Sequence, residues 1–141
     1  MAEWLRDHPR AAAAHRWQGI LHKDRDALRT AVALDADERL ARIYLLRELI
    51  NAVAFATRHL PDGELLYEAE VVHHSLSEAA QLLAQLPEDE ERRSLARGVA
   101  QQQALVEDFL AWSAQPEGIS FEQWCERRQR HYVWGVMYSF D

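Results

Sequence analysis

Apolar residues recur along this chain at the spacing of α-helices, and few residues interrupt the pattern. Only five Gly and four Pro occur in 141 residues, and most of them separate long stretches rich in Ala, Leu, Glu, Arg and Gln. Those residue types lose little side-chain entropy in a helix, so local preference and hydrophobic period agree. No segment alternates as a strand does, and no hairpin turn is present. The pattern predicts an all-α protein.

Breaks in the pattern divide the chain into five predicted helices. Pro9 suits the first turn of a helix, and two pairs, Asp35 with Glu38 and Ser120 with Gln123, have the spacing of a capping box. The predicted helices cover residues 9–33, 36–59, 64–86, 87–114 and a shorter segment from residue 120. Four long helices plus a shorter fifth predict an antiparallel up-and-down bundle in a single domain over residues 1–141.

The second and third predicted helices have different apolar faces. Between residues 43 and 56 the only charged or amide side chains are Arg47, Glu48 and Asn51, so this helix is expected at the centre of the bundle. The third helix has a narrow apolar stripe, as between near-parallel helices. The stripe consists of Leu65, Ala69, Val72, Leu76, Ala79, Leu83 and Leu86.

Composition narrows the class of protein. Hydrophobic residues make up 48% and charged residues 28%, as in soluble globular proteins. No apolar run approaches the roughly 18 residues that cross a bilayer. The first ten residues carry acids where a signal peptide is basic, and they lack its apolar region. Cys125 is the only cysteine, so a cytoplasmic protein without an internal disulfide is expected.

The net charge of −7 is concentrated in the middle of the chain. Residues 61–118 contain twelve Asp and Glu against three Arg, whereas residues 1–60 contain ten Arg and Lys against eight Asp and Glu. An acidic surface disfavours nucleic acid and anionic membranes, which need a cationic footprint, and favours a basic partner protein. Alternatively, the acidic helices neutralise the Arg-rich second helix within the molecule.

Glu70, His73 and His74 have the spacing that most clearly indicates a functional site, namely one that binds a metal ion. A Glu and a His three residues apart on one helix can bind one cation, and di-metal bundle proteins repeat this spacing on two helices. No second Glu-x-x-His occurs here, and the trio falls mainly on the outer face of its helix. Glu70 and His73 are therefore candidate metal ligands, with a solvated surface pair as the alternative, and no cofactor is predicted.

The run from His74 to Glu78, His-Ser-Leu-Ser-Glu, resembles in part the His-x-Leu-Lys-Gly run of histidine phosphotransfer domains. The resemblance implies an exposed imidazole that accepts a phosphoryl group. However, it covers about seven residues, and Ser77 and Glu78 stand where that family has the Lys that stabilises the phosphoryl charge and the Gly that lets its partner approach. The chain is therefore not assigned to this family.

Arg47, Glu48 and Asn51 form a third candidate site within the apolar second helix. Buried charges are costly unless they are paired, so these side chains need partners. They either line a pocket between helices or emerge at the edges of the buried surface and pair with neighbouring helices.

The C-terminal segment interleaves cations with aromatic residues, a combination that protein interfaces enrich. Trp124, Tyr132 and Trp134 are expected to pack onto the bundle, because a free tail would expose much apolar surface. Alternatively, the segment docks onto another chain. Cys125 is expected to be a packed thiol, and no catalytic residue is predicted. The candidate binding residues of this segment are Arg127, Arg128 and His131.

The leading interpretation is a non-enzymatic protein–protein interaction module, such as an adaptor, regulator or inhibitor. Its contact surface would be the acidic third and fourth predicted helices or the aromatic C-terminus. The partner is then another protein, and a homodimer stays open. The alternative is a helical-bundle protein or enzyme that binds a metal or small ligand through Glu70 and His73 or through Arg47, Glu48 and Asn51.

Overall fold

The fold consists of helices joined by short turns. The computed structural model describes residues 11–35 and 37–132. No strand occurs in these ranges, so the predicted all-α class is confirmed. The helices are α2 (Ala12–His22), α3 (Arg25–Leu34), α4 (Arg39–Thr57), the 3-10 helix η1 (Leu60–Asp62), α5 (Ala69–Ala84), α6 (Glu90–Ala114) and α7 (Phe121–Arg127).

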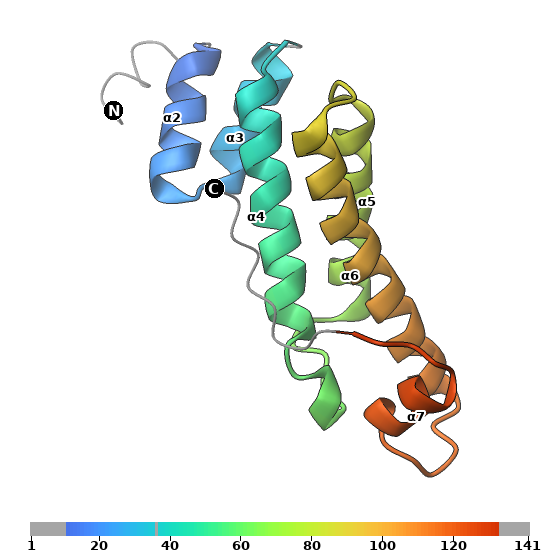
Figure 1. Ribbon diagram of the computed structural model, residues 1–141. Helices are drawn as coiled ribbons and strands as arrows, with labels where there is room; N and C mark the ends of the chain where they lie inside the picture. Colours follow the sequence, from blue (N-terminus) through green and yellow to red (C-terminus); the bar gives the residue numbers. More distant parts are fainter. Residues whose placement is uncertain (1–10, 36, 133–141) are drawn as a thin grey trace.

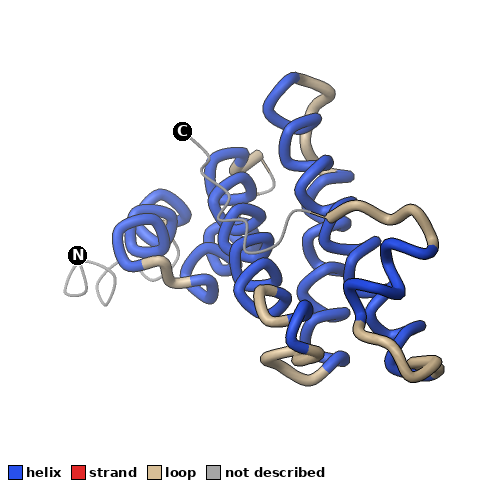
Figure 2. Tube along the Cα trace, turned by 60° about the horizontal axis from the view of Figure 1, so that its bottom comes forward, coloured by secondary structure: helices blue, strands red, loops and turns tan. Residues whose placement is uncertain are grey.

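Helix α4 lies at the centre of the molecule. It packs against α2 and α3 on one side and against α5 and α6 on the other (Figure 1). At the lower end in that view, α7 contacts both α6 and η1. Figure 2 shows that loops and turns connect the described helices throughout. Among the described helices, none is long and apolar enough to cross a membrane.

The prediction of one helix over residues 9–33 is wrong, because the described part of this stretch forms two helices. The backbone turns at Lys23, whose φ of 51° is left-handed. Asp24 then begins α3, and its carboxylate accepts hydrogen bonds from two backbone N–H groups of the first turn. Asp is a favoured N-cap residue for this reason. Pro9 lies outside the described residues.

A glycine lets α2 and α3 approach closely beside this turn. Gly19 is buried, and a Cβ atom at its position would lie only 2.4 Å from Cγ of Leu28. Any larger residue would therefore displace Leu28, which is fully buried in the core. The hairpin of α2 and α3 depends on this contact.

Helix α4 has the central position that its apolar sequence predicts, but it begins at Arg39 rather than at residue 36. Eleven of its 19 residues are buried. The predicted capping box of Asp35 and Glu38 is wrong, because Glu38 makes no side-chain cap. Its buried carboxylate instead accepts hydrogen bonds from the guanidinium of Arg16, the shorter at 2.9 Å, and so ties α2 to the start of α4.

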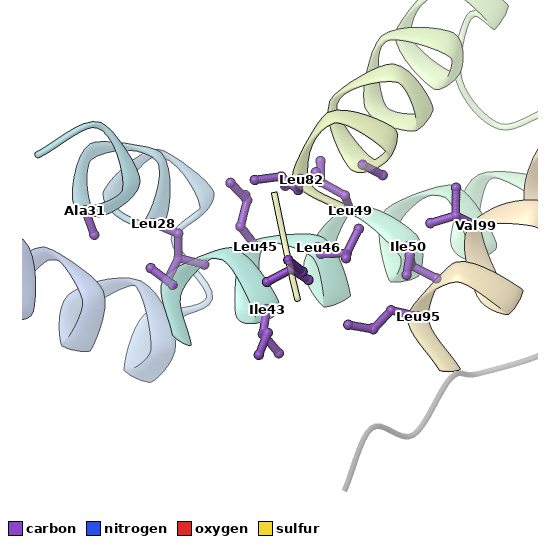
Figure 3. Packing of buried hydrophobic residues seen from close by; sticks show 13 residues of the cluster. Leu28, Ala31, Ile43, Leu45, Leu46, Leu49, Ile50, Leu82, Leu95 and Val99 are labelled. Carbon is purple, nitrogen blue, oxygen red and sulfur yellow. The ribbon is translucent and has the colours of Figure 1, made fainter. Parts of the chain in front are cut away.

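The largest cluster of buried hydrophobic residues surrounds the N-terminal half of α4 (Figure 3). Its members from α4 are at most 2% exposed. Burial of a Leu or Ile side chain contributes about 1.5–3 kcal/mol, so this cluster holds the neighbouring helices on α4. The α4 members include Ile43, Leu45, Leu46, Leu49 and Ile50, and they meet Leu28 of α3, Leu82 of α5, and Leu95 and Val99 of α6.

Helix α5 begins later than predicted, at Ala69. Residues 64–68 form an irregular segment, in which the Leu66 backbone N–H donates to the carbonyl of Ala56 at 3.0 Å. Four of the seven residues of the predicted stripe are buried. Leu65, Ala69 and Leu83 are only partly covered, and Leu82 is buried in place of Leu83. The buried members of the stripe are Val72, Leu76, Ala79 and Leu86.

The next two helices begin at side-chain caps. Helix α6 starts at Glu90 rather than at residue 87, because Asp89 is its N-cap and accepts from a backbone N–H of the first turn. Helix α7 follows the predicted capping box, in which Ser120 and Gln123 each accept from the other's backbone N–H.

An aromatic cluster anchors α7 on the end of α6. Phe121 is 1% exposed, and its ring lies edge-on to Phe109 with 5.4 Å between centroids. The rings of Trp112 and Trp124 also lie beside it. The indole N–H of Trp112 donates to the carbonyl of Ile119 at 3.0 Å, so the loop before α7 is fixed to the same cluster.

Candidate functional site

An open hollow of about 250 Å³ lies between α4 and α5, and we call it the apolar groove. Its walls come mainly from small and apolar side chains, with one cation, Arg25, at its edge. The lining residues are Arg25, Ala52, Val53, Phe55, Ala56, Tyr67, Val71, Val72 and Ser75.

Three large hydrophobic side chains of the apolar groove are exposed. Phe55 is 45%, Tyr67 51% and Val71 53% exposed. The rings of Phe55 and Tyr67 lie 6.3 Å apart, and the guanidinium of Arg58 lies 4.4 Å from the centre of the Phe55 ring. The backbone hydrogen bond from Leu66 to Ala56 of α4 brings Tyr67 beside Phe55. Large apolar side chains that gather on a surface mark a binding site more often than single ones do.

A second, larger hollow of about 560 Å³ adjoins the apolar groove, and we call it the charged cavity. It lies between the start of α3 and the first turns of α5. Arg25, Val71 and Ser75 line both hollows, so the two form one continuous surface. The remaining lining residues are Lys23, Asp24, Asp26, Arg29, Glu70 and His74.

Arg29, which lines the charged cavity, forms an ion pair with Glu78 that holds α3 against α5. The Arg29 guanidinium donates to both carboxylate oxygens of Glu78, at 2.8 and 2.9 Å. The hydrogen bond with Glu78 raises the pKa of Arg29 above its ordinary value, so its charge is permanent. This bidentate geometry positions the walls of the cavity.

Four other charged or titratable groups of the cavity stay available for a ligand. Within the described residues, Lys23, Arg25, Glu70 and His74 make no side-chain hydrogen bond or ion pair. All four side chains are exposed. The site therefore combines an apolar floor with cations and a carboxylate at its rim.

The two candidate metal ligands face different hollows. Glu70 lines the charged cavity together with His74, whereas His73 lines a separate hollow of about 200 Å³ with Glu107. In the described part of the chain, no group of three or more His, Cys, Asp or Glu side chains could hold one metal ion. The structure thus brings Glu70 together with His74 rather than with His73.

The candidate residues of α4 lie at the edge of its buried surface. Arg47, Glu48 and Asn51 are half-buried. Arg47 pairs with Glu91 of α6 at 2.8 Å, and its guanidinium lies 5.3 Å from the centre of the Tyr44 ring. Arg47 therefore pairs with a neighbouring helix, which is the second of the two alternatives that the sequence left open, rather than lining a pocket.

Acidic residues before and within the first turn of α6 pair with arginines of the same molecule. Arg39 bridges Asp89 and Glu91, at 2.8 and 3.2 Å. The backbone N–H of Arg92 and, next, the side chain of Arg39 lower the pKa of Asp89. Two further pairs lie nearby, Glu88 with Arg92 and Glu90 with Arg93. The pairs made by Arg39 and Arg47 of α4 are the neutralisation by the Arg-rich second helix that the charge distribution left open, whereas the other two pairs are local to the start of α6.

The C-terminal candidates are exposed, and their neighbours differ. Arg127, Arg128 and His131 all lie at the surface. The guanidinium of Arg128 lies 3.8 Å from the centre of the Trp124 ring and pairs with Glu117 at 3.1 Å. Arg128 is therefore partly engaged within the chain.

The aromatic residues of this segment pack as predicted where they are described. Trp124 is buried, and Tyr132 packs against the aromatic cluster of α6 and α7. The Tyr132 hydroxyl donates to the carboxylate of Asp108. Trp134 lies outside the described residues.

Cys125 is buried beside this cluster, and burial, followed by the nearby charge of Asp108, raises the pKa of its thiol to about 11. We expect negligible reaction with a disulfide reagent at pH 8 and a rate that rises toward pH 11, because the thiolate is the nucleophile. The rate in denaturant is the control. Fast reaction of the folded protein at pH 8 would contradict the burial of this thiol.

The raised pKa of Cys125 also sets the direction in which the stability of the fold changes with pH. Between about pH 9 and 11 the unfolded chain has released the thiol proton while the folded chain retains it. The Cys125 thiol therefore costs stability as pH rises through this range. Replacement by Ala should remove that component of the pH dependence.

Phe55, Tyr67 and Val71 are the site residues that sequence reasoning missed. The second predicted helix is apolar nearly all round, so nothing in its pattern distinguishes Phe55 from the buried residues beside it. Tyr67 lies in an irregular segment that the sequence placed in a helix. The sequence pattern therefore carries no signal that would have found this aromatic pair.

Comparison of the chain with models of protein families, with curated proteins and with solved structures finds no match.

Proposed function

We propose that this protein is a non-enzymatic helical interaction module, acting as an adaptor, regulator or inhibitor, and that it binds its partner at the apolar groove. The observation that carries the proposal is the gathering of Phe55, Tyr67 and Val71, all exposed, around one hollow. Exposed apolar residues with a polar rim are typical of protein-binding surfaces, and aromatic and Arg side chains are enriched there.

The acidic surface of α5 and α6 is a weaker candidate for the main contact. Its carboxylates near the start of α6 are already paired with arginines, so a basic partner would have to displace those pairs. Arg127 and His131 remain secondary contacts for an acidic group. The apolar groove needs no such exchange, because its side chains are already exposed.

The proposal includes an antiparallel up-and-down bundle in the cytoplasm as the scaffold. Support for the bundle comes from the chain direction, which reverses between successive helices from α2 to α6 in Figure 1. The net charge of −7 supports a protein partner over nucleic acid or an anionic membrane. The scaffold presents α3, α4 and α5 at one surface.

The size of the assembly in a native extract tests this function. Wild-type protein should elute above the size of a 16.3 kDa chain, and Val71→Glu should elute as the free chain. A buried carboxylate in the contact is costly, whereas Val71 is exposed in the free chain and its replacement leaves the fold intact. Ala104→Glu, at an exposed position of α6, is the matched control. Elution of all three as free chains would refute the proposal.

A small-ligand function is the second candidate, because the charged cavity has the volume of typical small-molecule sites. Glu70 and His74 would then contact the ligand. Elemental analysis of untagged protein tests the metal version of this candidate. Near-stoichiometric Zn, Fe or Mn that is lost in Glu70→Ala would favour it over the interaction module.

A further inference from the structure

We infer that the partner at the apolar groove is a second copy of this chain, in a two-fold symmetric dimer in which Arg25 of each copy faces Glu70 of the other. The inference rests on the proposed function and names the partner of the same site. It is carried by the signs and positions of the charges that border the groove.

A two-fold contact uses the same patch on both copies, so the patch must be complementary to itself. The rim of this site carries both signs. Lys23 and Arg25 lie on the α3 side of the charged cavity, and Glu70 lies on the α5 side. Rotation of a second copy by half a turn about an axis between the two sides places a cation opposite a carboxylate twice.

These charges are not used within one chain. Arg25 and Glu70 line the same cavity, yet neither makes an ion pair with a described residue. Arg29 and Glu78, one helical turn or more farther along the same two helices, do pair with each other. Arg29 and Glu78 therefore satisfy each other within the chain, and Arg25 and Glu70 are left for a contact from outside. A partner of a single charge sign would match only one side of this rim.

Exposed apolar residues lie next to these charges, on the side of the apolar groove. Val71 lies on the border of the two hollows, and it is 53% exposed. An axis near Val71 brings the two Val71 side chains together and directs Tyr67 and Phe55 of each copy toward the other. Such an interface has the apolar centre and polar rim of protein contacts.

Sedimentation velocity of the purified full chain across the micromolar range tests the dimer. Wild-type protein should show a species of twice the 16.3 kDa chain mass that grows with concentration. Arg25→Glu and Glu70→Arg should each weaken dimerisation by at least about tenfold, because like charges then meet at both symmetric positions. The double variant should restore it, since each new Glu meets a new Arg.

A matched charge reversal and a fold check accompany these variants. Arg97→Glu, on the exposed surface of α6, should leave dimerisation unchanged. Helical circular dichroism and the melting curve of each diluted variant show that the chain still folds.

Three results would overturn the inference. They are a wild-type monomer at every concentration, a dimer that neither single variant weakens, and a double variant no better than the singles. A purified monomer that nevertheless forms a larger assembly in extract, lost in Val71→Glu, would overturn the dimer alone and leave the interaction module standing. Free chains in both settings would refute both proposals.

Discussion

Replacing Phe121 by Ala is expected to lower the free energy of unfolding by about 3–5 kcal/mol, the range for a fully buried Phe. Phe121 is 1% exposed and contacts the rings of Phe109, Trp112 and Trp124. The substitution leaves a cavity among these three rings that the short helix α7 cannot refill. Domains of this size have a total stability of about 5–15 kcal/mol, so a large part would be lost.

The same substitution at Phe55 is the matched control. Phe55 lies in the last turn of α4 and is 45% exposed, so its loss leaves no cavity in the core. We expect a change within about 1 kcal/mol, as surface substitutions usually give. Urea unfolding followed by circular dichroism measures both. Equal losses at Phe55 and Phe121 would contradict the burial that distinguishes these two phenylalanines.

Truncation after Gln129 is expected to cost about 2–4 kcal/mol. It removes the ring of Tyr132 from the aromatic cluster and leaves the half-buried Asp108 carboxylate without its hydroxyl donor. Both losses act in the same direction. The melting temperature of the truncated chain should fall well below that of the full chain.

Single substitutions separate the causes of this loss. Tyr132→Phe keeps the ring and removes only the hydroxyl, so it should cost about 1–3 kcal/mol. Arg127→Glu should change stability within about 0.5 kcal/mol, whereas Arg128→Glu should cost more, because it loses the contacts with Trp124 and Glu117. A truncated chain with an unchanged melting temperature would show that the segment is not part of the fold and would favour a docking arm.

The spacing of the hydrophobic residues predicted the helical class and the central place of α4, because burial of apolar side chains determines both the class and that position. It did not predict the turn at Lys23. The break depends on the Asp24 cap and on the close packing of Gly19 against Leu28. The Asp24 cap is a local signal that the hydrophobic period does not contain, whereas the contact of Gly19 with Leu28 exists only once the two helices meet.

In the candidate site, too, some features could be predicted from the sequence and others depend on tertiary packing. The exposed C-terminal cations and the buried Trp124 agree with the sequence pattern, since the segment alternates cations with aromatics. The apolar groove could not be predicted, because Phe55, Tyr67 and Arg25 come from three separate segments. Their proximity follows from tertiary packing, through the bond of Leu66 to α4 and the bridge of Arg29 to Glu78.

Photo-crosslinking from the groove tests the central claim most directly. A benzophenone amino acid replaces Tyr67, and the cells that express this variant are irradiated. We expect a discrete covalent adduct with a protein, either another copy of this chain or a different partner. The same probe at Ala104 should give none. If irradiation yields no protein adduct from position 67, or the same adducts from both positions, the apolar groove is not the contact surface of this protein.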